Sequence, residues 1–441
     1  MSIARRRFVQ FAGCGMAAPW VIPGSALGLG AWESPGNRIT VAMIGFGRQA
    51  AMVNVRAFLE APDAQVVAVC DVDGWRVEEG KRRVEEHYSK RADAGAFRGC
   101  FTTKDYRAVL ERRDVDTVMI STNDQWHVPI AVAAVEAGKD VSCEKPITRT
   151  IAEGRKLSDL VVKHRRVFRV DSEFRSIPHM HRACELVRNG RIGKLKRILS
   201  GVPAGDNVAC PYAVTDHMPV PEELDYDLWQ GPAPRAPYHE ERVQPRKQYG
   251  RPGWMRVLYY CDGMVTNWGT HLNDIVQWGN DTERTGPVEI EGRGEYPTAD
   301  RLWNVLKTFA IRYRYANGVE LVYESTTPYV RFEGSEGWIR IDYPKGITAE
   351  PASVLESKIG PDEIHFPLKS EKRDFLDAVR SRGATLADAE VGHRTTSLCH
   401  LGHIAVYLGE KLRWDPQKER FLNSDAANAL IDKPIHAPRR A

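Results

Sequence analysis

The stretch RITVAMIGFGRQAA at residues 38–51 decides the fold of this chain. Its apolar, partly β-branched run at 38–44 is typical of a buried parallel strand, and residues 51–60 have a helical pattern. Between them lies a G-x-G-x-x-A turn in the strand–turn–helix context of a dinucleotide-binding fingerprint. In such a turn the first glycine permits the sharp bend, and the second lets backbone amides approach a pyrophosphate. We therefore expect the nucleotide to contact the turn residues Gly45, Phe46, Gly47, Arg48 and Gln49.

A carboxylate at the end of the second apolar run indicates which nucleotide binds. Residues 65–70 form this run, and Asp71 follows it, close to the spacing of about 20 residues expected between the turn and a ribose-binding acid. A carboxylate there accepts hydrogen bonds from the ribose hydroxyls and repels a 2′-phosphate, so NAD is favoured over NADP. Arg76 is the reservation, because it could fold back towards a phosphate. The alternative role for Asp71 is that it only caps the next helix.

Strand and helix patterns continue to alternate after this point. Strands are expected at residues 116–121 and 140–143, with a helix at 130–137 between them. This alternation predicts an α/β Rossmann domain with a doubly wound parallel sheet, which binds ligands at the carboxyl ends of its strands. The polar residues just beyond these ends are Thr122, Asn123, His127, Glu144 and Lys145. We expect the nicotinamide and its substrate to meet there.

Length and composition exclude several classes of protein. The chain has 441 residues, 42% of them hydrophobic, which suggests two globular domains. A net charge of +4, part of it at the N-terminus, does not indicate nucleic-acid binding. The 8 cysteines contain no C-x-x-C pair or Cys/His cluster, so neither a metal site nor a disulfide framework is expected.

The N-terminus has the pattern of a targeting signal. Arg5, Arg6 and Arg7 precede a mildly apolar run at 11–29, which is too short and too rich in glycine and proline for a comfortable membrane span. Paired arginines at this position are typical of a twin-arginine signal, a route that carries folded proteins. We expect residues 1–30 to direct export to the periplasm or beyond the cytoplasm, without stable membrane insertion. The alternative is a basic, disordered N-terminus.

Several motifs, in order, resemble those of one family. They are STNDQWH (121–127), AGKDV (137–141), CEKP (143–146), YDLWQGP (226–232) and NWGTHLND (267–274), with EVGHR (390–394) and LRWDP (412–416) near the end. Together with the glycine-rich turn, they resemble the Gfo/Idh/MocA oxidoreductases over residues 38 to nearly the end. The two tail motifs are similar to the exported branch of that family.

The resemblance implies a domain order. It implies an NAD-binding Rossmann domain at 31–150, then an α/β domain at 151–368 built on a large, mostly antiparallel open sheet, whose outer face often forms a homo-oligomer interface. Residues 369–441 are expected to form C-terminal helices and a tail that pack back on the Rossmann domain. Independently of the resemblance, residues 311–326 and 329–343 alternate as strands do.

The resemblance also implies catalytic residues. Lys145 matches the lysine of the family's E-K-P motif, beside the nicotinamide, and His271 matches the acid or base of its D-x-G-x-H pattern. This chain has Asn267 where that pattern has aspartate, and an amide cannot take a proton. If residues 267–278 are helical, Asn267, His271 and Asp274 lie on one face, where Asp274 could orient the imidazole. An equally open alternative is that Asp274 only forms a hydrogen bond on the helix face.

These residues favour an NAD-dependent oxidoreductase acting on a hydroxyl group of a sugar, polyol or glycoside. Residues 200–255 are rich in aromatic and polar side chains of the kind that bind sugars, although they could equally be a structural insertion. The main alternative is an NAD-dependent glycoside hydrolase or lyase that uses transient oxidation and elimination. A non-catalytic sugar-binding protein is a third possibility. The presence of Lys145 favours the oxidoreductase.

Overall fold

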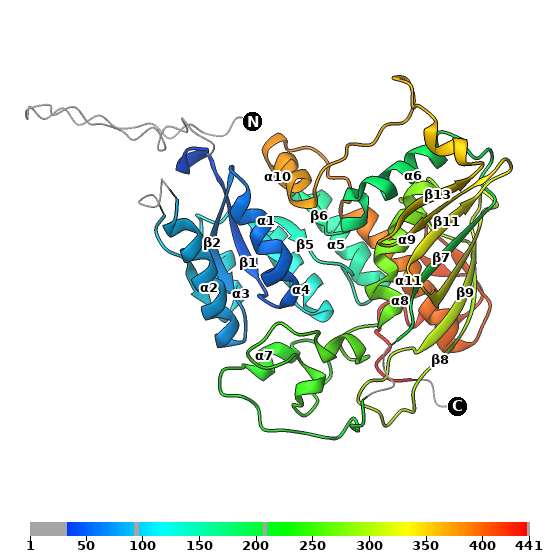
Figure 1. The fold of residues 1–441 in the computed structure, drawn as a ribbon. Helices are drawn as coiled ribbons and strands as arrows, with labels where there is room; N and C mark the ends of the chain where they lie inside the picture. Colours follow the sequence, from blue (N-terminus) through cyan, green and yellow to red (C-terminus); the bar gives the residue numbers. More distant parts are fainter. Residues whose placement is uncertain (1–32, 92–96, 206–209, 439–441) are drawn as a thin grey trace, which may run out of the picture.

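The N-terminal half contains the predicted parallel sheet. The computed structural model describes residues 33–91, 97–205 and 210–438. Its six-stranded sheet has the order β3-β2-β1-β4-β5-β6 (Figure 1). All of these strands pair in parallel. They are β1 (Ile39–Ile44), β2 (Ala64–Cys70), β3 (Phe101–Thr103), β4 (Thr117–Ile120), β5 (Asp140–Cys143) and β6 (Phe168–Val170). This order confirms the doubly wound fold, whose strand order reverses next to β1.

Helices join these strands. They are α1 (Val55–Glu60), α2 (Gly74–Ser89), α3 (Tyr106–Leu110), α4 (Asp124–Glu136) and α5 (Ile151–His164). A π-helical turn at Ala50–Asn54 leads from the glycine-rich turn into α1. Two apolar clusters hold the helices in place. Each cluster contains a different set of buried residues from strands β1, β2 and β4. Residues 1–30, for which a twin-arginine signal was predicted, lie outside the described residues.

The C-terminal half contains the large open sheet. Its order is β13-β12-β11-β7-β10-β9-β8-β14-β15. The strands are β7 (Arg197–Pro203), β8 (Glu289–Glu295), β9 (Thr308–Arg314), β10 (Glu320–Thr326), β11 (Tyr329–Glu333), β12 (Trp338–Asp342), β13 (Gly346–Glu350), β14 (Leu412–Asp415) and β15 (Arg420–Phe421). The pair β7–β10 is parallel, and the other pairs are antiparallel. The two regions predicted as strands, 311–326 and 329–343, are therefore two hairpins.

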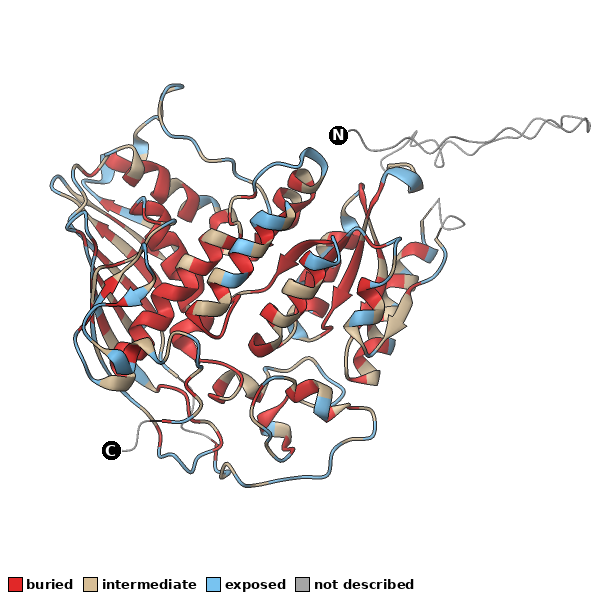
Figure 2. Ribbon diagram, turned by 180° about the vertical axis from the view of Figure 1, so that it is seen from behind, coloured by how far each residue is buried: buried red, intermediate tan, exposed pale blue. Residues whose placement is uncertain are grey.

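One face of this sheet is covered by helices. These are α6 (Pro178–Arg188), α8 (Met264–Asn267), α9 (Gly269–Gly279) and α11 (Ala389–Leu408), and Figure 2 shows that they are largely buried. Burial alternates along β9, with Phe309, Ile311 and Tyr313 facing the core and Arg312 exposed. Such alternation is expected of a sheet with one face on the core and the other turned outward.

Two of the expected domain boundaries differ from the structure. Strand β6 belongs to the Rossmann sheet, so this domain extends beyond residue 150 to Val170. Of the region 369–441, helix α10 (Glu371–Ser381) packs on the Rossmann domain through Phe375 and Leu376. Strands β14 and β15 instead extend the large sheet. The tail therefore packs on both domains, because its apolar residues Trp414 and Phe421 complete the C-terminal core.

A long irregular segment at residues 210–256, which we call the crossing segment, leaves the C-terminal half after β7 and packs against the Rossmann domain before it returns at α8. It contains α7 (Tyr226–Gln230) and runs beneath both domains in the view of Figure 1. Its own small apolar core includes Trp229, Tyr238 and Val243. It contacts the Rossmann domain through a bridge between Asp73 and Leu224, and the Trp126 indole donates to the carbonyl of Leu228 at 2.9 Å. Within the described ranges, no helix is long and apolar enough to cross a membrane.

Candidate active site

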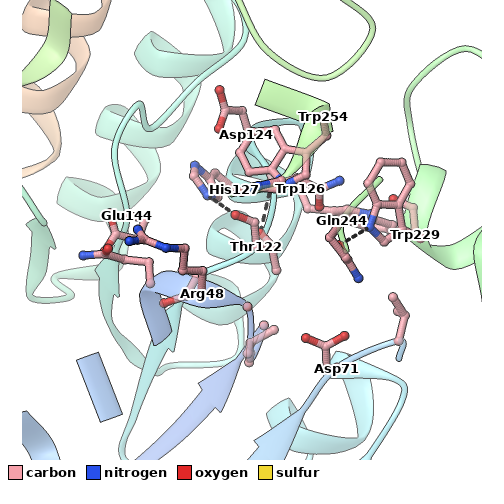
Figure 3. Close-up of a pocket in the computed structure, with 18 of the residues that line it drawn as sticks. Arg48, Asp71, Thr122, Asp124, Trp126, His127, Glu144, Trp229, Gln244 and Trp254 are labelled. Carbon is pink, nitrogen blue, oxygen red and sulfur yellow. Dashed lines mark hydrogen bonds between the residues drawn. The ribbon is translucent and has the colours of Figure 1, made fainter. Parts of the chain in front are cut away.

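A pocket of about 700 Å³ lies at the carboxyl edge of the Rossmann sheet, a volume suited to a cofactor with a small substrate. Its walls come from the loops after β1, β2, β4 and β5, from the crossing segment, and from α8 and α9. The pocket joins the glycine-rich turn at one end to Lys145 and His271 at the other. Figure 3 shows the side chains of its central part, with Asp71 apart from His127 and Glu144.

The glycine-rich turn fits a dinucleotide. Gly45 has φ +85°, and a Cβ atom there would lie 2.6 Å from the Ser121 carbonyl oxygen, so only glycine is accommodated. A Cβ on Gly47 would meet no atom within 4 Å, which leaves open space on the pocket side of the turn. Arg48 and Gln49 also line the pocket. Phe46 does not: its ring is fully buried in the core, which corrects its predicted cofactor contact.

Asp71 lies where the ribose-binding acid was predicted. Its carboxylate lines the pocket and accepts the backbone N–H groups of Phe46 (2.7 Å) and Asp73 (2.9 Å). Burial raises the pKa of this carboxyl, and nearby Arg76 opposes the rise. The cap of α2 is Asp73, which accepts the N–H of Trp75, so Asp71 is not merely a helix cap. Arg76 is tied to the crossing segment through the carbonyls of Pro245 and Gln248.

Thr122 and Asn123 in the loop after β4, and His127 near the start of α4, all line the pocket. The imidazole of His127 lies between two carbonyl oxygens: Nδ1 is 2.7 Å from Pro146 O and Nε2 is 3.2 Å from Thr122 O. Burial lowers the pKa of His127 to about 4, so the ring is neutral at physiological pH. His127 therefore joins the loops after β4 and β5 and forms part of the pocket wall.

Glu144 and Lys145 follow β5. Glu144 accepts the side-chain amide of Asn54 at 2.9 Å, and burial raises the pKa of its carboxyl to about 7. Lys145 reaches across to the second domain, where its ammonium group donates to the backbone carbonyl of Asn267 at 3.1 Å. A direct hydrogen bond thus joins the E-K-P lysine to the end of α8, just before α9.

His271 lies on α9 at the far end of the pocket. Its ring stacks on Phe174 with centroids 4.6 Å apart and an interplanar angle of 21°. Burial, aided by the positive charge of Lys145, lowers the pKa of this imidazole well below its ordinary value. Its Nδ1 is buried without a hydrogen-bond partner among the described residues. The ring is therefore a neutral base, and Asn267 lines the pocket beside it.

Asp274 corrects the sequence-based prediction. Both of its carboxylate oxygens are engaged by Arg175, each at 2.7 Å, and Ser172 also donates to one of them. It does not line the pocket. Asp274 lies three residues after His271 on α9, so the two are neighbours along the helix. Its side chain, however, points to the 3₁₀ turn Glu173–Ser176. Asp274 therefore fixes that turn on α9 and does not orient the imidazole.

Two carboxyl groups of the pocket were missed from the sequence. Asp124, the first residue of α4, is 2% exposed, and burial raises its pKa to about 7. Glu173 follows β6, and its Oε1 lies 3.8 Å from Nε2 of His271. Both residues follow the carboxyl ends of parallel strands. The expectation that residues at these ends line the ligand site, which selected Lys145, therefore applied to them as well. The crossing segment adds Gln244, Trp254 and Met255, for which the sequence has no positional signal.

The parallel sheet, the glycine-rich turn and a pocket closed by a second α/β domain define a two-domain, dinucleotide-binding oxidoreductase. Two family models match: the NAD-binding Rossmann fold of the oxidoreductase family over residues 39–172, and its C-terminal alpha/beta domain over 208–441. The second match alone covers more than half of the chain. The chain belongs to the Gfo/Idh/MocA oxidoreductase family, and its N-terminal domain binds NAD.

Relatives with described activities match over shorter regions. Levoglucosan dehydrogenase of Pseudarthrobacter phenanthrenivorans is 35% identical over 94 residues, 21% of this chain and 24% of the relative. A glycosyl hydrolase family 109 protein of Saccharopolyspora erythraea is 33% identical over 131 residues, 29% of this chain and 27% of the relative. The chain thus spans about a quarter of the length of these two relatives. A solved levoglucosan dehydrogenase in complex with NADH and levoglucosan has the same fold, with a TM-score of 0.59, 17% identity, and coverage of 85% of this chain and 99% of that one.

Proposed function

We propose that this chain is an NAD-dependent oxidoreductase that transfers hydride between the cofactor and a hydroxyl-bearing carbon of a sugar, polyol or glycoside. The observation that carries the proposal is that one continuous pocket contains the glycine-rich turn, Lys145 and His271. The partial similarity to levoglucosan dehydrogenase supports a carbohydrate as substrate.

The pocket residues supply what this reaction needs from the protein. NAD, when bound, accepts or returns the hydride. His271 is neutral and buried, and it can take the hydroxyl proton as a general base. The ammonium group of Lys145 stabilises negative charge that develops on the same oxygen. Asn267 cannot take a proton, so its amide serves to hold the substrate by hydrogen bonds.

The test is formation of NADH when the purified protein is given NAD and a panel of sugars, polyols and glycosides. We expect at least one compound to be oxidised, and we expect Lys145→Met to slow that oxidation by about 10²-fold or more while NAD still binds. If Lys145→Met turns over its substrate as fast as the unchanged protein, the assignment of this site is wrong.

A second candidate function is redox-neutral cleavage of a glycoside. The similarity to a glycosyl hydrolase family 109 protein and the presence of Asn267 in place of an aspartate favour it. In this reaction the hydride that leaves the sugar returns to it after elimination of the aglycone. Release of aglycone without net NADH, from a chromogenic glycoside, would identify this reaction and displace simple dehydrogenation.

We further propose that residues 1–30 direct export by the twin-arginine route. The support is the Arg5–Arg6–Arg7 sequence ahead of a mildly apolar run. Fusion of residues 1–30 to a reporter that is active only after folded export tests this, with Arg5→Lys and Arg6→Lys together as the control. Equal export of the control fusion would contradict the proposal.

We also propose that copies of this chain form a homo-oligomer through the outer face of the nine-stranded sheet. The support is the family resemblance together with the absence of covering helices on that face in the described residues. Light scattering of the purified protein tests it, because a monomeric mass at micromolar concentration would contradict the proposed interface.

A further inference from the structure

Glu173 is the only carboxylate within 4 Å of the His271 imidazole among the described residues. Asn267, which replaces the family's aspartate, bears no charge. Asp274 is occupied by Arg175, and the carboxylates Asp124 and Glu144 form no ion pair with the ring. Glu173 is therefore the acidic neighbour of the His271 ring in the described part of the chain.

The turn that carries Glu173 is held against α9 by the residues that follow it. The turn Glu173–Ser176 is fixed to α9 by the Arg175–Asp274 ion pair, in which both side chains are at most 2% exposed. Phe174, between these residues, stacks on the His271 ring. Three consecutive residues of the turn thus contact α9, and the first of them brings its carboxylate to Nε2.

The two partners differ in their access to water. The side chain of His271 is 10% exposed, whereas that of Glu173 is 41% exposed. The imidazole is thus largely shielded from water, whereas Glu173, which lines the same pocket, is more accessible to it. The gap of 3.8 Å exceeds a hydrogen bond, and a small rotation of the partly exposed Glu173 side chain closes it.

We propose that Glu173 is the proton outlet of the active site and takes over the charge of the aspartate that is missing at Asn267. This rests on the proposed function. The hydroxyl proton of the substrate first binds the His271 imidazole as the hydride leaves carbon. The imidazolium then transfers the proton from Nε2 to the Glu173 carboxylate, and from there it passes to water. Alcohol and NAD⁺ become carbonyl compound, NADH and one proton in solution, so charge and atoms balance.

The charges around Glu173 are mixed. Lys145, Lys372, Asp171 and Glu371 interact with its carboxyl, and burial together with the acidic neighbours raises its pKa. A carboxyl with a raised pKa binds a proton more readily at working pH than an ordinary glutamate does.

The experiment compares Glu173→Gln with Glu295→Gln, a control that removes an exposed carboxylate paired with Lys307 outside the pocket. We expect Glu173→Gln to lower kcat by about 10²-fold with little change in NAD affinity. Formate or acetate in the buffer should restore part of the rate, because a small acid can carry the proton. Adding Asn267→Asp to Glu173→Gln should also restore part of it. Glu295→Gln should behave as the unchanged protein.

A second readout does not need turnover. Titration of the His271 ring by NMR should show a lower imidazole pKa in Glu173→Gln than in the unchanged protein, because the carboxylate favours the imidazolium. An unchanged His271 titration overturns the proposal, as does a kcat for Glu173→Gln within about twofold of the unchanged protein. A loss that neither small acids nor Asn267→Asp relieve overturns it as well. If no sugar or glycoside reacts at all, the proposed function fails, while the NMR titration still decides the role of Glu173.

Discussion

The substitution Asp274→Asn separates the two roles considered for this residue. Asp274 and Arg175 form a bidentate ion pair in which the side chains are 2% and 1% exposed. Loss of one partner of such a buried pair costs about 3–5 kcal/mol, because the other charge is left uncompensated. Arg175 keeps a second carboxylate, Glu283, at 2.9 Å, so we expect the lower end of that range. A loss of about 3 kcal/mol changes the unfolding equilibrium by about 10²-fold.

The assay is urea unfolding followed by tryptophan fluorescence, together with the pH profile of kcat. We expect the unfolding midpoint of Asp274→Asn to fall while the shape of the pH profile is kept. Glu283→Gln, which removes the partly exposed partner of Arg175, is the matched control and should cost less than about 1 kcal/mol. An unchanged midpoint with a shifted pH profile would show that Asp274 orients His271 after all, and the structural reasoning would be refuted.

Three further outcomes follow from the site. Gly45→Val should abolish NAD binding measured by calorimetry, because a side chain at φ +85° would collide with the Ser121 carbonyl; wild-type affinity in this variant would contradict the assigned turn. Asp71→Ala should weaken NAD binding by about tenfold, equivalent to one charge-assisted hydrogen bond, and equal affinity would argue against ribose contact. Stability should fall as the pH drops from 6.5 towards 4, since the unfolded chain protonates His127 while the folded one does not, and His127→Gln should flatten this slope in urea unfolding series.

The Rossmann half was predictable because its signals are local. A strand, a glycine-rich turn and a helix follow one another within residues 38–60, and the packing of Ala50 depends on the same short stretch. The strands of the large sheet were also visible as alternating residues. Their order was not, because β7 pairs with β10 and β11, which are distant in sequence and are selected by the common core.

The site was predictable only in part, for a related reason. The residues that follow strand ends lie at one edge of the sheet in any doubly wound fold, which placed Thr122 and Lys145 correctly. The partner of a given side chain, by contrast, depends on contacts between residues that are far apart in the sequence. Arg175 and Asp274 are 99 residues apart, and helix periodicity alone gave no indication that this arginine would occupy the carboxylate. The burial of the Phe46 ring was not predicted, because a residue of a turn can direct its side chain into the core while its neighbours line the pocket.

The charge of the active site is a further property that the sequence misstates. Among the carboxyl groups that line the pocket, Asp124, Glu144 and Glu173 interact with Lys145, and a count of residues assigns these three groups three negative charges. Burial raises the pKa of Asp124 and of Glu144 to about 7, so a large fraction of each is protonated at neutral pH. Fewer fixed negative charges then compete for the ammonium group of Lys145. That group remains available to negative charge on the reacting oxygen, which is where catalysis requires it.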